Sequence, residues 1–114
     1  MSSVRIGIHD YKIKLVSEQE INTAHQQGKR MNGFINFEKK EIMINTERDE
    51  ITLSETMVHD VLHGLMWEWD IQNNLDISDE IEEKLVNTLA KGLIQVMRQM
   101  VFHNIVENLK DKEK

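Results

Sequence analysis

Two histidines spaced four residues apart, His59 and His63, have the residue type and spacing of a metal-binding pair. On a helix they would project from one face about one turn apart, so that both imidazoles can reach a single cation. Imidazole nitrogens are common ligands of Zn²⁺. Because Asp60 follows the first histidine, the pattern reads H-D-x-x-H. The pair is predicted to bind a metal, and the alternative is two polar residues at the edge of a packed helix.

Asp60 stands where zinc hydrolases of the H-E-x-x-H type carry a glutamate. In those enzymes the glutamate takes a proton from the water that attacks a peptide carbonyl. Aspartate is one methylene shorter, and general-base catalysis needs its carboxylate at roughly 3 Å from that water. Asp60 is therefore predicted as the catalytic base, and it is also the position at which catalysis could be lost.

A third ligand is expected from the acidic run "SDEIEEK" at 78–84. Ser78 is a good N-cap, and carboxylates in the following first turn are favoured by the helix dipole. At about 100° per residue, the centre of this helix's apolar face lies nearly over Glu82, with Glu83 at its margin. The periodicity slightly favours Glu82, and a solvated acidic first turn is the alternative for both glutamates.

Two helices are predicted to position these residues. Thr52 and Glu55 fit a capping box that opens a helix running to about Trp67. Its buried face is predicted at Val58, Leu62, Leu65 and Met66. The long C-terminal helix that starts after Ser78 carries an apolar stripe made of Ile81, Leu85, Leu89, Leu93, Val96 and Met100.

The first part of the chain has the period of two that is typical of strands. Residues 4–17 alternate apolar and polar around His9-Asp10, which predicts two half-buried strands and a tight turn. A second hairpin is predicted from 34–37 and 41–45. The polar segment between the two hairpins fits either a short helix or a loop. The predicted fold is α+β, with a small, mainly antiparallel sheet of three or four strands packed against the motif helix and the long C-terminal helix.

Composition narrows the function further. A chain of 114 residues fits one domain, here 1–114, and the formal charge of −6 without a basic stripe argues against nucleic-acid binding. The absence of cysteine leaves His, Asp and Glu as metal ligands. No apolar run approaches the roughly 18–20 residues of a membrane span, and the N-terminus lacks the apolar region of a signal peptide. We therefore expect a cytoplasmic protein that acts on a protein and not on a membrane.

The sequence "ITLSETMVHDVLHGLMWEWDI", followed by "SDEIEEKLVNTLAKGLIQVM", resembles the small phage and mobile-element relatives of the ImmA/IrrE metallopeptidase family, which belongs to the zincins. The resemblance covers nearly the whole chain and fixes several spacings at once. The matching positions are 33–37, 42–44, Glu55, Thr56, His59, His63, Glu83, Val86, Leu89, Ala90, Gly92, Leu93, Gln95 and Val96.

The resemblance implies a Zn²⁺ site made of His59, His63 and a later glutamate. The family's "E-x-x-V-x-x-L-A" spacing places that glutamate at Glu83, which we prefer over Glu82 because helix starts are uncertain by a residue or two. It also implies a peptidase that acts on a regulatory protein, in a setting where relatives are linked to relief of repression. The alternative is a catalytically inactive zincin-like protein that inhibits or sequesters a host or phage protein.

Two further features concern partners. Trp67 and Trp69 fit packing at the helix end, or an exposed edge for a protein partner, since tryptophan is favoured in interfaces. The apolar pattern continues after Gln99 as "MVFHNIVENL", which predicts a homo-oligomeric contact through the C-terminal helix.

Overall fold

The structure is a computed structural model that describes residues 2–25 and 32–98. Its elements in chain order are β1 (Ser3–Ile6), β2 (His9–Val16), α1 (Glu18–His25), β3 (Gly33–Asn36), β4 (Glu41–Asn45), α2 (Glu50–Glu68), α3 (Ile71–Leu75) and α4 (Asp79–Arg98). The predicted α+β class is confirmed. None of the helices within the described ranges has both the length and the apolar character needed to cross a membrane.

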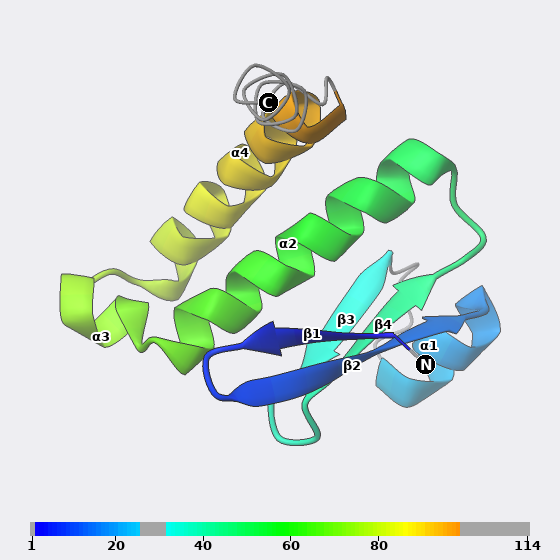
Figure 1. Ribbon diagram of the computed structural model, residues 1–114, viewed down its shortest axis with the longest axis horizontal. Helices are drawn as coiled ribbons and strands as arrows, with labels where there is room; N and C mark the ends of the chain where they lie inside the picture. The colour runs from blue at the N-terminus through cyan, green and yellow to red at the C-terminus, as the bar shows by residue number, and fades with distance from the viewer. Residues whose placement is uncertain (1, 26–31, 99–114) are drawn as a thin grey trace, which may run out of the picture.

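The four strands form one sheet in the order β1-β2-β4-β3 (Figure 1). The two hairpin pairs are antiparallel as expected, with Val4 opposite Tyr11 and Ile35 opposite Ile42. The central pair, β2 and β4, is parallel, with Ile13 opposite Ile42. The chain reaches this arrangement because α1 and β3 separate the two central strands in sequence. The sheet is thus mixed, and β1 and β3 form its edges.

The turn between β1 and β2 lies at Gly7 and Ile8, two residues before the predicted position. Gly7 has a φ of +63°, a left-handed conformation that glycine adopts without a steric penalty. The shift leaves Ile8 exposed in the turn, although the alternation placed it on the buried face with Ile6. Turn geometry therefore changed which apolar residue of the first hairpin is buried.

Helix α2 covers one face of the sheet and forms the main core with it (Figure 1). The buried centre of that core consists of Ile6, Tyr11, Ile42 and Ile44. Along α2, the residues packed against this centre recur every four positions: Leu53, Met57, Val61 and Leu65. Gly64 permits the close approach, because a Cβ there would lie 2.7 Å from Cδ1 of Ile6. Of the predicted buried face, Leu65 packs against the core and Met66 is buried.

The start of α2 differs from the predicted capping box. The cap is Asp49, whose carboxylate accepts a hydrogen bond from the backbone amide of Thr52 at 2.7 Å. The helix begins at Glu50, two residues before Thr52. An aspartate at this position satisfies one of the free amides of the first turn, as a threonine cap would.

Helix α4 packs on α2, which lies between it and the sheet (Figure 1). Its buried residues are Val86, Ala90 and Ile94. Most residues of the predicted stripe are exposed. The buried residues each follow a member of that stripe by one position in the sequence. The predicted member Met100 and the homo-oligomeric contact expected after Gln99 lie outside the described residues. The face that contacts α2 is therefore not the most hydrophobic face of α4.

A polar cluster fastens the end of α2 to the sheet. The hydroxyl of Tyr11 donates to Oε2 of Glu68 at 2.5 Å, and the ammonium of Lys40 donates to the same oxygen at 2.8 Å. These two bonds hold the pKa of Glu68 below its usual 4.5, the contact with Lys40 having the larger effect. The ionised carboxylate is thus favoured in the folded chain.

We expect Glu68→Gln to lower the free energy of unfolding by about 1–2 kcal/mol at neutral pH, because a charged hydrogen-bond acceptor is lost. Because the pKa of Glu68 is lower in the folded chain than in the unfolded chain, its carboxylate stabilises the fold above pH 4.5. This stability is lost as the pH falls through the folded-state pKa. The variant should therefore lose less stability than the wild type between neutral pH and about pH 3. Urea unfolding across this range measures both effects. Glu38→Gln, at an exposed position, is the control, and equal pH slopes for Glu68→Gln and the wild type would contradict the assignment.

Candidate metal centre

The candidate site lies between α2 and the first two turns of α4. The short helix α3 reverses the chain between them, with left-handed residues at its two ends, Asp70 at φ 51° and Asp76 at φ 54°. Ser78 then starts α4 as predicted, because its hydroxyl accepts from the amide of Ile81 at 3.2 Å. This reversal brings the glutamates of α4 beside the histidines of α2.

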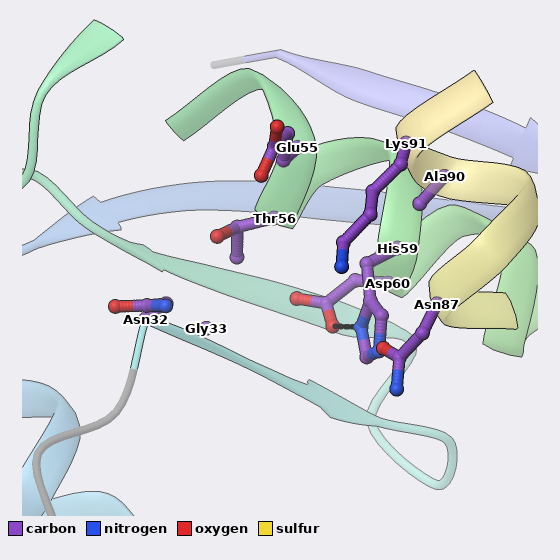
Figure 2. A pocket seen from close by; sticks show the side chains of 9 residues that line it. All are labelled: Asn32, Gly33, Glu55, Thr56, His59, Asp60, Asn87, Ala90 and Lys91. Carbon is purple, nitrogen blue, oxygen red and sulfur yellow. Dashed lines mark hydrogen bonds and ion pairs between the residues drawn. The ribbon is translucent and has the colours of Figure 1, made fainter. Parts of the chain in front are cut away.

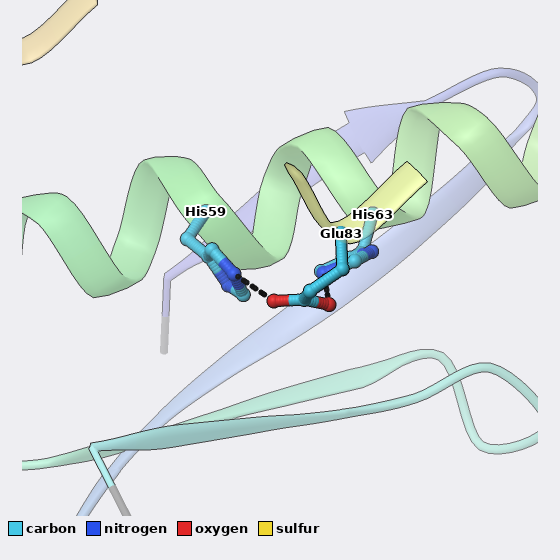
Figure 3. A group of neighbouring side chains, drawn as sticks. All are labelled: His59, His63 and Glu83. Carbon is cyan, nitrogen blue, oxygen red and sulfur yellow. Dashed lines mark hydrogen bonds and ion pairs between the residues drawn. The ribbon is translucent and has the colours of Figure 1, made fainter. Parts of the chain in front are cut away.

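His59, His63 and Glu83 form a compact group (Figure 3). Nε2 of His59 lies 3.0 Å from Oε1 of Glu83, and Nε2 of His63 lies 3.1 Å from Oε2. One ligand atom from each residue lies within 4.8 Å of the other two. The carboxylate thus faces the same ring nitrogen of both histidines. These are the three residues that the family resemblance proposed.

Each histidine has its other nitrogen turned toward a second carboxylate. Nδ1 of His63 lies 2.7 Å from Oε2 of Glu82, and Nδ1 of His59 lies 3.5 Å from Oδ1 of Asp60. Carboxylates in this position orient metal-bound histidines and fix the tautomer that leaves Nε2 free to bind. The structure therefore places Glu82 behind a histidine, outside the group of three, although the helix periodicity slightly favoured it as the ligand.

Gln72 is a supporting residue that the sequence did not indicate. Its amide donates to Oδ1 of Asp79 at 2.7 Å and to Oε1 of Glu82 at 3.1 Å. It connects α3 to the first turn of α4 and fixes the carboxylate of Glu82 against His63. Glutamine in a polar connecting segment has no distinguishing spacing, so only the three-dimensional contact reveals this role.

The donor set of the group fits Zn²⁺. Two imidazole nitrogens and one carboxylate are a common protein ligand set of hydrolytic zinc sites. Ligands about 2 Å from a tetrahedral zinc ion are separated from one another by about 3.4 Å, close to the two nitrogen–oxygen distances found here. Glu83 is about half exposed, so the group is open to solvent on one side. Without an ion, the same contacts form an ion-paired network between one carboxylate and two histidines.

Asp60 is held away from this group, under the edge strand β3 (Figure 2). The residue is 5% exposed, and its Oδ2 has no hydrogen-bond partner among the described residues. A Cβ at Gly33 would lie 2.7 Å from this oxygen and 2.4 Å from Cγ2 of Thr56. A glycine is therefore required at the start of β3 to make room for the carboxylate. The carboxylate contacts Nδ1 of His59, on the opposite side of the ring from Glu83.

The electrostatics follow from these contacts. The hydrogen bond to Asp60 raises the pKa of His59 above 6.5, with a further contribution from Glu83 and an opposing effect of burial. Burial raises the pKa of Asp60 above 3.8, against the opposing influence of His59. In the absence of a cation, His59 therefore keeps its proton to a higher pH than a free imidazole.

A hollow of ≈ 270 Å³ opens beside Asp60 and His59. It is bounded by the start of β3, by α2 and by α4, and polar groups such as Asn87 and Lys91 line it (Figure 2). Asp60 is one of the residues that line the hollow, and its Oδ2 is buried against Gly33. The hollow is large enough for several water molecules or part of a bound chain.

The two tryptophans lie beyond the histidines at the end of α2. Trp67 is 59% exposed and stacks on Phe37, with ring centroids 4.7 Å apart, and Trp69 is 60% exposed. The structure therefore agrees with an exposed aromatic edge and not with core packing.

Comparisons with protein-family models, with curated proteins and with solved structures find no match to this chain. The resemblance to the ImmA/IrrE family remains a prediction from the residues themselves.

Substitution of the two glutamates should separate their roles. We expect Glu83→Gln to abolish tight Zn²⁺ binding, because a ligand is lost. Glu82→Gln should weaken it by about 10–100-fold, the usual effect of removing a partner of a metal-bound histidine. Competition with a chromophoric chelator measures both affinities, and circular dichroism checks the fold. Glu80→Gln, in the same turn of α4, is the control. A larger loss with Glu82→Gln than with Glu83→Gln would reverse the assignment.

Proposed function

We propose that this chain is a zinc-binding, metallopeptidase-like protein that acts on another protein. The observation that carries the proposal is the carboxylate of Glu83, which faces Nε2 of His59 and of His63 while Glu82 and Asp60 stand behind the rings. Zn²⁺ held by these three residues would act as a Lewis acid toward a water molecule and a peptide carbonyl. The phage or mobile-element setting implied by the resemblance and a cytoplasmic location are part of this proposal.

In this proposal the chain's own residues have separate tasks. His59, His63 and Glu83 hold the ion, and Glu82 keeps the ring of His63 oriented. Asp60 is the proton acceptor, and its Oδ2 has no hydrogen-bond partner among the described residues. Burial raises the pKa of Asp60, which makes its carboxylate a stronger base than an exposed aspartate.

A second candidate keeps the zinc site without catalysis. Asp60 contacts Nδ1 of His59 and not the side of the ring that faces Glu83, so it is placed to orient the histidine. The exposed tryptophans Trp67 and Trp69 offer aromatic contacts of the kind found in protein interfaces. In this form the chain binds and inhibits or sequesters a host or phage protein.

Zinc content is the first test of the proposal. We expect one zinc per chain by elemental analysis after purification without a chelator, and a melting temperature that falls when EDTA is added, because an ion bound to the folded state stabilises it. His59→Ala and His63→Ala should lack the ion and show no EDTA effect. His9→Ala is the matched control. Metal-free wild-type protein that gains no stability from added Zn²⁺ would remove both candidate functions.

Catalysis is tested with the zinc-loaded protein and unfolded casein as the probe, with new peptide ends detected by mass spectrometry. If Asp60 is the base, Asp60→Asn should retain zinc and slow cleavage by about 10²–10⁴-fold. Cleavage that is unaffected by Asp60→Asn would remove Asp60 from the mechanism. Zinc-loaded wild-type protein that cleaves nothing would favour the binding protein over the peptidase.

A further inference from the structure

A second hollow, of ≈ 280 Å³, lies on the His63 side of the candidate metal centre. It is bounded by the end of α2, by α3 and by the start of α4, whereas the hollow beside Asp60 lies on the His59 side (Figure 1). The two hollows therefore flank the group of His59, His63 and Glu83. A protein segment that lies across this group can reach both of them.

The lining contributed by α3, its N-cap and the first turn of α4 is acidic. Asp70, Asp79 and Glu82 line the hollow, and among the described residues no lysine or arginine does so. Oδ1 of Asp70 accepts a hydrogen bond from the amide of Asn73 at 2.8 Å, and Oδ1 of Asp79 accepts one from Gln72 at 2.7 Å. These neutral amides orient the carboxylates without cancelling their charge. The hollow is thus electrostatically suited to a cation.

An aromatic surface is the second feature of the lining, and it is independent of the charges. Trp67 and Phe37 both line the hollow, and their rings stack with centroids 4.7 Å apart. Trp67 nevertheless remains 59% exposed, so the stack holds the indole in place without covering it. The face of an indole attracts cations, and arginine is the side chain most often found there. Ca²⁺ or Mg²⁺ would gain nothing from this surface, because these ions bind through oxygen ligands.

We infer that this hollow receives an arginine side chain of the protein on which the chain acts. The guanidinium lies against Trp67 and pairs with the carboxylates, a combination that suits its flat shape and its several N–H donors. Because His63 lines the same hollow, the arginine belongs to the segment next to the one that faces the candidate metal centre. The inference rests on the proposed function for the identity of the partner, a protein, and adds a preference for one residue type.

The charge preference is tested with two pentapeptides that have blocked ends and four alanines. One has a central arginine and the other has citrulline, the uncharged isostere of arginine. We expect the zinc-loaded full chain to bind the arginine peptide about 10-fold more tightly, because its hydrogen bonds to the carboxylates are charge-assisted. Titrations followed by NMR amide shifts measure both affinities and locate the site. Equal affinities, or shifts confined to residues outside the hollow, would overturn the inference.

Substitutions distinguish the hollow from the generally acidic surface. Asp70→Asn and Asp79→Asn keep Oδ1 as an acceptor and remove one charge each. Each should reduce the arginine preference by about 2–5-fold, and the double variant should lose most of it. Asp76→Asn is the matched control, because Asp76 has the same left-handed backbone as Asp70 and does not line the hollow. A double variant that retains the full preference would overturn the inference.

The aromatic surface is tested separately. Trp67→Leu should weaken binding of the arginine peptide by about 2–5-fold, because the cation loses the face of the indole. Trp69→Leu is the matched control, since Trp69 is 60% exposed and does not line the hollow. Equal effects of the two variants would overturn the role of Trp67.

A failure of this inference is distinguishable from a failure of the proposed function. His59→Ala removes a proposed metal ligand and leaves the lining of the hollow unchanged, so it should still prefer the arginine peptide. Zinc-loaded wild-type protein without this preference would overturn the inference and leave the zinc site in place. A chain that binds no zinc and keeps the preference would remove the proposed metal function and support the arginine site.

Discussion

Helix α2 has to pack closely against the sheet on one side and against α4 on the other, and the arrangement of the candidate site depends on both contacts. Gly64 permits the first contact, because a Cβ there would lie 2.7 Å from Cδ1 of Ile6 and the buried Ile6 side chain would have to shift. The second contact is made by small and medium side chains of α4, among them Ala90. His59 and His63 lie where these contacts meet, so the positions of their rings relative to Glu83 are set by packing on two sides.

Three carboxylates surround two imidazoles in this site, and the nitrogen that each carboxylate faces distinguishes their roles. Glu83 faces both Nε2 atoms, whereas Glu82 and Asp60 face the Nδ1 atoms. The departure at Asp60 also has a structural counterpart in Gly33, which leaves room for the carboxylate under the edge strand. The two residues therefore have to be considered together in any account of the mechanism.

Some features that depend on neighbours in sequence were predictable, although the cap of α2 and the β1–β2 turn each lie two or three residues before their predicted positions. Features that depend on packing were not predictable. The helix spacing of His59 and His63 and the Ser78 cap are local, and the structure contains both. Glu82 and Glu83 point about 100° apart around α4, so the choice between them required knowing which face of the helix meets α2. The apolar periodicity pointed to the wrong face. That error came from the assumption that the most hydrophobic face is the buried one. The parallel pairing of β2 with β4 leaves no local pattern either, because it depends on how α1 and β3 are placed between them.

Helix α4 carries Glu83 and also the buried side chains of Val86, Ala90 and Ile94 on one element. An ion shared by His59, His63 and Glu83 would join two segments that are 24 residues apart in sequence and restrain the tilt of α4 on α2. Metal occupancy and the packing of α4 on α2 would then be thermodynamically linked, so that each stabilises the other.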